Sequence, residues 1–210
     1  MKLVKNLILE IVDFLEKNLE TKSEIKILQS IKDISLREDN FGYHVPNFPP
    51  KERALYDAIS SIESSGLLGI KESLATVIGD LRWNIDDGNF YDKNSEIGES
   101  YLLGNMNCEL IGPTLGAFRS NGLRLGLFLL EENIFYKDHK HKAAELYLNL
   151  TNGTQWRFAE VTSLPDQKFG LVPQDLDAVP GEWKPPLDLE TVGRSSNQRA
   201  PFVFDHQHRV

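Results

Sequence analysis

The chain has 210 residues, of which 40% are hydrophobic and 26% charged, as in an ordinary globular protein. Its net charge of −8 argues against a surface for nucleic acid or for anionic lipid. The single cysteine, Cys108, excludes an internal disulfide framework, and no apolar run approaches the ~20 residues of a membrane span. Because charged residues also interrupt the first twenty positions, which therefore lack the core of a signal peptide, we expect a soluble cytoplasmic protein.

Hydrophobic residues recur every three or four positions in the first eighty residues, which is the spacing of amphipathic helices. We expect helices at about 1–20, 23–35, 51–64 and 67–82, with Ser23 as the N-cap of the second. The segment 41–50 holds three prolines and cannot continue a helix. These patterns predict an N-terminal helical region, residues 1–83.

Short segments with strand character follow a turn-rich stretch at 83–100. Gly-Pro, Ser-Asn-Gly and Thr-Asn-Gly turns separate them. The expected strands lie at 100–112, 123–132, 132–138, 144–150 and 155–161. Helices first and strands afterwards predict an α+β chain, with an antiparallel sandwich or barrel over residues 84–164.

The composition changes again in the tail, residues 165–210. The first 164 residues contain fourteen isoleucines and the tail contains none, although it holds six of the ten prolines. A divergent segment, a loosely ordered extension and a late change of reading frame would each leave this mark. We therefore treat 165–210 as a third, divergent and proline-rich segment.

The segment FYKDHKHKAAELYLNL, residues 135–150, concentrates side chains that bind metals. His139 and His141 are two positions apart, as are Glu145 and Tyr147, so each pair would share one face of a strand. Two imidazoles and a carboxylate suit iron, zinc, manganese, cobalt or nickel. A solvated turn with exposed His and Lys is the alternative, but Glu145 and Tyr147 at this spacing favour a metal site.

The segment HKHKAAELYLNLTNG resembles the first motif of the cupin superfamily, in which His-x-His, three residues and Glu precede a Gly at a turn. GNMNCELIGP and the helical first third extend the resemblance, over about residues 1–160, to the cupin-type dimethylsulfoniopropionate (DMSP) lyase family. Tyr147, two residues after Glu145, and Tyr136, eleven residues before Tyr147, narrow it to this family. The resemblance implies N-terminal helices packed on a cupin-like antiparallel β-barrel, a double-stranded β-helix.

The same resemblance implies a site and a reaction. His139, His141 and Glu145 match the ligands of one divalent transition metal, Tyr147 the tyrosine that acts as base or weak ligand, and Tyr136 a second active-site tyrosine. The implied function is a metal-dependent lyase that cleaves DMSP to dimethyl sulfide and acrylate by tyrosine-assisted β-elimination. Its partner would be this small molecule, and a homodimer stays open. Taken alone, each tyrosine is better explained by packing in a half-buried strand.

The chain departs from the family pattern at the second cupin motif, a Pro-Gly followed by a metal-binding histidine. The Pro-Gly is present at 180–181, but no histidine occurs between His141 and His206. His206 or His208 could supply the missing ligand, water could replace it, or the barrel could be incomplete. Two alternatives to the lyase follow: a non-catalytic or decayed cupin binding module, and another metal-dependent cupin enzyme such as a dioxygenase or isomerase.

Overall fold

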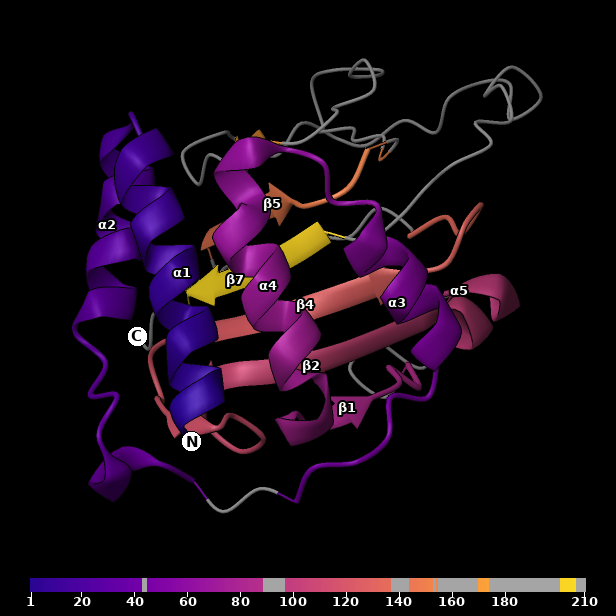
Figure 1. Ribbon diagram of the computed structural model, residues 1–210, viewed down its shortest axis with the longest axis horizontal. Coiled ribbons are helices and arrows are strands. Elements are labelled where there is room, and N and C mark those ends of the chain that lie inside the picture. Colours follow the sequence, from indigo (N-terminus) through magenta and orange to yellow (C-terminus); the bar gives the residue numbers. More distant parts are fainter. Residues whose placement is uncertain are drawn as a thin grey trace.

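The structure is a computed structural model, and it describes residues 1–42, 45–88, 97–136, 144–152, 154, 170–173 and 201–206. Four helices from the first third of the chain lie on one face of a β-sheet built from the rest (Figure 1). The predicted α+β class is therefore confirmed. Among the described residues, no helix is both long enough and apolar enough to cross a membrane.

The helices are α1 (Lys2–Asn18), α2 (Lys22–Lys32), α3 (Glu52–Ser60) and α4 (Leu68–Val77), with 3-10 turns at Glu38–Asn40, Ser65–Leu67 and Ile78–Asp80. Each is shorter than predicted, but all four occur where the hydrophobic spacing placed them. The apolar stripe of α1 is fully buried and includes Leu7, Ile11 and Leu15. Burial of this stripe against the sheet and α4 stabilises the helices more than their intrinsic propensity does.

The N-cap of α2 differs from the prediction. Thr21, not Ser23, caps this helix, because Glu24 stands three residues after Thr21 and completes a capping box. The Glu24 backbone N–H donates to the Thr21 hydroxyl at 3.3 Å, and the Thr21 N–H donates to the Glu24 carboxylate at 2.8 Å. Ser23 lies inside the first turn of the helix, so the prediction for it was wrong.

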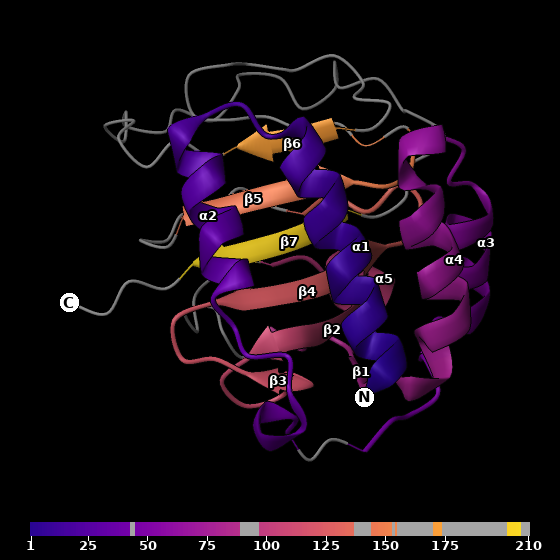
Figure 2. The same cartoon turned by 60° about the vertical axis from the view of Figure 1, so that its left-hand side comes forward.

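The described residues contribute seven strands to the sheet, which are β1 (Trp83–Asn84), β2 (Asn105–Gly112), β3 (Phe118–Arg119), β4 (Arg124–Leu130), β5 (Ala144–Asn149), β6 (Gly170–Pro173) and β7 (Pro201–His206). Their order is β1-β2-β4-β7-β5-β6 (Figure 2), with β3 paired to β2 in parallel. Every other pairing is antiparallel. Within the described ranges no pairing joins β6 to β1, so this part of the sheet is open.

The tail supplies an interior strand of the sheet. Val203 of β7 pairs with Gly126 of β4 on one side and with Tyr147 of β5 on the other. Strand β6 also comes from the tail and pairs with the outer side of β5. The predicted division of the chain at residues 83 and 164 stays a prediction, but strands from both sides of residue 164 form one sheet.

Two expected strands differ from the structure in their described parts: the one expected at 100–112 is a strand only from Asn105 onward, as β2, and the one expected at 132–138 is not a strand. Residues Glu99–Gly104 form a short helix, α5, ahead of β2. Two hydrogen bonds hold Tyr101 of this helix in place: its hydroxyl donates to Asp86 in the loop after β1, and its carbonyl accepts from the Asn105 side chain at the start of β2. At the segment expected over 132–138, Asn133 has a φ of 61°, which ends any extended run. The strand expected at 155–161 lies outside the described residues.

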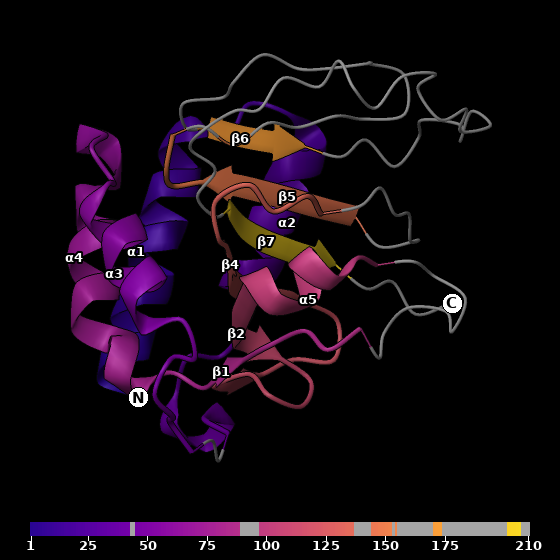
Figure 3. The same cartoon turned by 90° about the vertical axis from the view of Figure 1, so that its right-hand side faces the viewer.

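The two faces of the sheet carry different side chains. Alternate residues of β4 and β5, among them Leu127 and Leu146, join the hydrophobic core formed with α1–α4. The intervening positions point the other way. Short helix α5 lies on that opposite side of the sheet (Figure 3). We call this side the polar face, and on β2, β4 and β5 its polar and aromatic residues are Asn105, Asn107, Glu109, Arg124, Phe128, Glu145, Tyr147 and Asn149.

Candidate active site on the polar face

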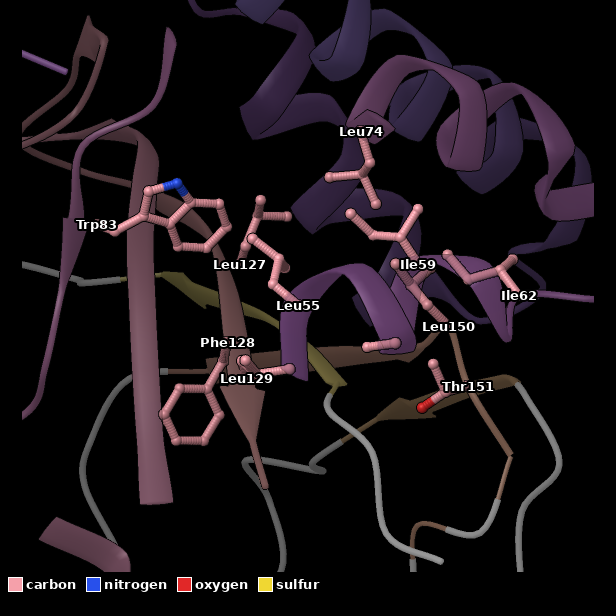
Figure 4. A pocket seen from close by; sticks show the side chains of 11 residues that line it. Leu55, Ile59, Ile62, Leu74, Trp83, Leu127, Phe128, Leu129, Leu150 and Thr151 are labelled. Atoms are coloured by element: carbon pink, nitrogen blue, oxygen red, sulfur yellow. The ribbon is translucent and has the colours of Figure 1, made fainter. Parts of the chain in front are cut away.

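A cavity of about 40 Å³ lies between the helices and the sheet. Aliphatic side chains of α3, α4 and β4 line it, including Leu55, Leu74 and Leu127 (Figure 4). None of the residues predicted to carry chemistry borders this space. It is a small apolar gap in the core, and the candidate site lies on the opposite face of the sheet.

Glu145 and Tyr147 meet on the polar face of β5. The Tyr147 hydroxyl donates a hydrogen bond to Oε2 of Glu145 at 2.6 Å. Both side chains are almost fully buried, with 5% and 4% of their surface exposed. Because β5 has β7 on one side and β6 on the other, the backbone that carries this pair is held from both sides. The result is a phenol and a carboxylate fixed at hydrogen-bond distance in a site of low solvent access.

Tyr136 belongs to an aromatic cluster on the same face. Its ring stacks on Tyr101 with a centroid distance of 4.8 Å and an interplanar angle of 7°. It also packs against Phe128 of β4 at 5.4 Å, tilted by 53°. The cluster therefore joins three segments of the chain, namely α5, β4 and the stretch that follows β4.

A hydrogen-bond network fixes the Tyr101 side of this aromatic cluster. The Tyr101 hydroxyl donates to the Asp86 carboxylate at 2.7 Å. Asn105 donates to the carbonyls of Asp86 and Tyr101 at 2.9 and 2.8 Å, and its Oδ1 accepts from the Asp86 N–H at 2.7 Å. Every polar group of the Asn105 side chain is thereby used, and α5 is tied to the loop that follows β1.

The pairing register relates the aromatic cluster to the carboxylate–phenol pair. Arg124, Asp205 and Glu145 occupy one row across β4, β7 and β5. Gly126, Val203 and Tyr147 occupy the next. Phe128 lies one row further along, at the end where Tyr136 packs. The polar face thus carries a carboxylate at one end, the phenol of Tyr147 in the middle and aromatic rings at the other end.

The two predicted imidazole ligands, His139 and His141, lie outside the described residues. Strand β5 begins at Ala144, three residues after His141. The part of the chain that the structure describes contains no group of three or more potential metal ligands. The donors it does contain, a buried carboxylate and a neighbouring phenol oxygen, together with imidazoles this close in sequence, fit the ligand chemistry of a divalent transition metal.

The register bears on His206 as an alternative ligand. His206 pairs with Ala144, whereas the position that pairs with Glu145 is Asp205. Neighbouring positions of a strand belong to opposite faces. The register position of His206 therefore belongs to the face of Leu146, not to that of Glu145. His208 and the Pro-Gly at 180–181 lie outside the described residues.

Sequence reasoning did not single out two charged residues of this face, Glu109 and Arg124. The guanidinium lies 3.8 Å from the Glu109 carboxylate, longer than a good hydrogen bond. Neither Oε1 of Glu109 nor Nε of Arg124 has a hydrogen-bond partner in the described structure. Burial raises the pKa of the Glu109 carboxyl, although Arg124 and the backbone amides of residues 114–116 favour its charged form.

Sequence reasoning also missed Asn149, the last residue of β5. It is fully buried and shares the face of Tyr147, since the two are two positions apart on one strand. The signal was present in the alternation: positions 145, 147 and 149 have the same parity. Asparagine at a strand end is common in turns, which made this position look unremarkable in the sequence.

Helices on one face of a mostly antiparallel sheet, with a buried carboxylate–phenol pair on the other, define a cupin-like α+β protein. The family model of dimethylsulfoniopropionate lyases matches residues 19–169, more than two thirds of the chain. The chain therefore belongs to the DMSP lyase family, which makes it a carbon–sulfur lyase by family. A search of curated proteins finds no match to the sequence.

Solved structures of similar fold agree with this assignment. The DMSP lyase DddQ from Ruegeria pomeroyi DSS-3 superposes with a TM-score of 0.56 at 13% identity, covering 98% of this chain and 92% of that chain. A chain from crystal structures of the DMSP lyases RdDddP and RnDddQII gives a TM-score of 0.55 at 14% identity, covering 98% and 86%. At these identities the likeness shows the fold, and the predicted cupin-like fold is confirmed.

Proposed function

We propose that this chain cleaves DMSP to dimethyl sulfide and acrylate, with Tyr147 as the base and a divalent transition metal held by His139, His141 and Glu145. The observation that carries the proposal is the buried contact of 2.6 Å between the Tyr147 hydroxyl and the Glu145 carboxylate. A phenol in this position has an immediate acceptor for its own proton. Family membership supports the substrate.

The reaction requires a base and a leaving group. Tyr147, as phenolate, takes a proton from the carbon next to the substrate carboxylate, and the electron pair of that C–H bond forms the new C=C bond. The bond between carbon and sulfur breaks, its electron pair stays on sulfur, and neutral dimethyl sulfide leaves acrylate behind. The proton then rests on the Tyr147 oxygen until solvent removes it. A bound metal would supply Lewis-acid stabilisation of the substrate carboxylate.

The other residues of the face have supporting roles in this proposal. Glu145 orients Tyr147 through their hydrogen bond while the phenol carries its proton. Tyr136, held in place by its stack on Tyr101, forms one wall of the site. Because Glu145 and Tyr147 are both buried, the substrate would react away from bulk water, where electrostatic interactions are stronger.

Tyr147→Phe tests the role of the phenol. Because general-base catalysis contributes typically 10²–10⁴-fold, we expect kcat to fall by at least about 10²-fold. Metal content per chain should stay at the wild-type level, since the metal ligands of the proposal are untouched. The measurement is release of dimethyl sulfide into the headspace after DMSP is added to the metal-loaded protein. Tyr56→Phe, at a half-exposed tyrosine of α3, is the matched control and should keep full activity.

Three results would contradict the proposal. A Tyr147→Phe variant with wild-type turnover would exclude Tyr147 as the base. Wild-type protein that holds metal and releases no dimethyl sulfide would indicate a binding module or a cupin enzyme with another reaction. Glu145→Gln should lower the metal content, and a variant with unchanged content would place the metal elsewhere.

A further inference from the structure

Asn149 has a side chain that the described protein leaves unsatisfied. None of its surface is exposed, and neither Oδ1 nor Nδ2 has a hydrogen-bond partner among the residues that the structure describes. A buried amide without hydrogen bonds is destabilising, and such groups are rare in folded proteins. The Oδ1 acceptor and Nδ2 donor of this buried side chain therefore indicate that a ligand binds beside Asn149.

Asn105 provides an internal comparison. It is the other fully buried asparagine of the described chain, and its side chain makes three hydrogen bonds, to Asp86 and Tyr101. The same sheet thus satisfies one buried asparagine completely and leaves the other with no partner. The difference indicates that the two residues have different tasks.

The neighbours of Asn149 in the sheet cannot satisfy it with side chains. In the register, Asn149 pairs with Gly170 of β6 and with Pro201 of β7, neither of which has a polar side chain. Leu127 pairs with Phe202, so Phe128 falls on the same row as Asn149, two strands away. Asn149 is thus the polar residue of this row on β6, β5, β7 and β4, and the next polar residue of the row is Asn107 on β2.

The side chains of the polar face differ between the two ends of β5. Glu145, the proposed metal ligand, stands at one end, and Tyr147 leans toward it. Asn149 stands two residues beyond Tyr147, roughly 7 Å along the strand. The rings of Phe128 and Tyr136 lie at this same end. Aromatic faces and a carbonyl dipole both attract cations, whereas a metal attracts a carboxylate.

We propose that Asn149 contacts the sulfonium end of the substrate and positions it for cleavage, its carbonyl oxygen facing the dimethylsulfonium group. This inference rests on the proposed function, because DMSP carries a carboxylate at one end and a sulfonium at the other. With the carboxylate bound near Glu145, the cationic leaving group extends past Tyr147 to the row of Asn149 and Phe128. The substrate then supplies a partner for the carbonyl oxygen of the amide.

Asn149→Leu tests the inference, because leucine has a similar shape and no polar atoms. Binding is measured by calorimetry with two ligands on metal-loaded protein. One is 3-(trimethylammonio)propanoate, which keeps both charges of DMSP but has a poorer leaving group. The other is acrylate, which has only the carboxylate. We expect at least a tenfold weaker binding of the first ligand and less than a threefold change for acrylate.

Thermal unfolding separates a ligand contact from a structural role. Replacing an unmatched buried amide by an apolar group of the same shape should raise Tm by a few degrees. Asn105→Leu, the matched comparison, should lower Tm because it breaks three hydrogen bonds. If leucine does not fit at 149, Asn149→Ala should show the same split between the two ligands.

Several outcomes would overturn the inference. Equal weakening of both ligands, no weakening of either, or a Tm loss in Asn149→Leu as large as in Asn105→Leu would each do so. Wild-type protein that binds neither ligand would overturn it as well. Wild-type protein that binds 3-(trimethylammonio)propanoate through Asn149 but releases no dimethyl sulfide from DMSP would support the inference and contradict the proposed function.

Discussion

Two glutamates on the polar face have different surroundings. Glu145 is 5% exposed and accepts the hydroxyl of Tyr147. Glu109, on β2 and three strands away in the sheet, faces Arg124 at 3.8 Å, and its Oε1 has no partner within the described structure. Burial raises the pKa of the Glu109 carboxyl, and Arg124 at this distance offsets only part of that effect.

The raised pKa of Glu109 predicts a pH-dependent contribution to stability. Since the folded protein holds this proton more tightly than the unfolded chain, the contribution is complete below the ordinary pKa of 4.5 and is lost as the pH rises through the folded value. Glu109→Gln cannot lose a proton. The free energy of unfolding of the variant, relative to wild type, should therefore increase between pH 4.5 and 8. Chemical denaturation across this range measures it.

The exposed Glu63 provides the control for this experiment. Glu63→Gln should follow the wild-type stability curve more closely than Glu109→Gln does at every pH. A difference between wild type and Glu109→Gln that stays constant with pH would show that the two states bind this proton equally. It would also show that Arg124 compensates the buried charge fully.

At the residue scale, alternation along a strand was enough to predict that Glu145 and Tyr147 share a face. It could not predict that Tyr136 stacks on Tyr101, because that contact joins segments 35 positions apart and depends on where α5 lies. Nor could it reveal that Asn149 lacks partners, which depends on Gly170 and Pro201 occupying the adjacent strands. The alternation along a strand determines which of its residues share a face. The pairing of strands in the folded sheet determines which residues lie beside them.

Among the elements, α2 offers a direct test of the observed N-cap. Thr21→Ala removes the hydroxyl that accepts the Glu24 N–H and should cost about 1 kcal/mol of unfolding free energy. Ser23→Ala, within the first turn of the same helix, should cost much less, and it is the matched control. Urea denaturation of both variants gives the comparison, and an equal cost for both would contradict the capping box.

The helices were easier to predict than the strands for a physical reason. The apolar stripe of α1 runs from Val4 to Leu15, about three turns, so its period is unmistakable in the sequence. The segment at 99–104 is too short for any period, and its β-like composition misled the prediction. Its helical form depends on the hydrogen bond of Tyr101 to Asp86, a residue in a different loop. Tertiary contacts overrode local propensity there.

At the scale of the whole molecule, β7 determines whether the sheet is continuous. Val203→Pro removes a backbone donor in the middle of this interior strand, and the unmatched partner alone should cost about 1–3 kcal/mol. Val203→Ile keeps the ladder and is the control. Thermal unfolding should show a clear loss of Tm for the proline variant only. A proline variant as stable as wild type would mean that β7 is dispensable.

The order of the strands in the sheet could not be predicted from the sequence. Hydrophobic alternation and turns predicted β2, β4 and β5, but the composition of residues 165–210 gave no sign that 201–206 would lie between β4 and β5. Pairing between β4 and β7 joins residues more than seventy positions apart. Such partners are selected by the geometry of the completed sheet rather than by any local pattern.

The interior position of β7 has a consequence for biosynthesis. On the ribosome, α1–α4 and the β2–β4 hairpin emerge early and can form contacts that are close in sequence. Strands β4 and β5 must wait with open edges until residues 201–206 have been translated, and open edges favour association between chains. Nascent chains that stall before this point are thus the species most exposed to aggregation and most dependent on chaperones.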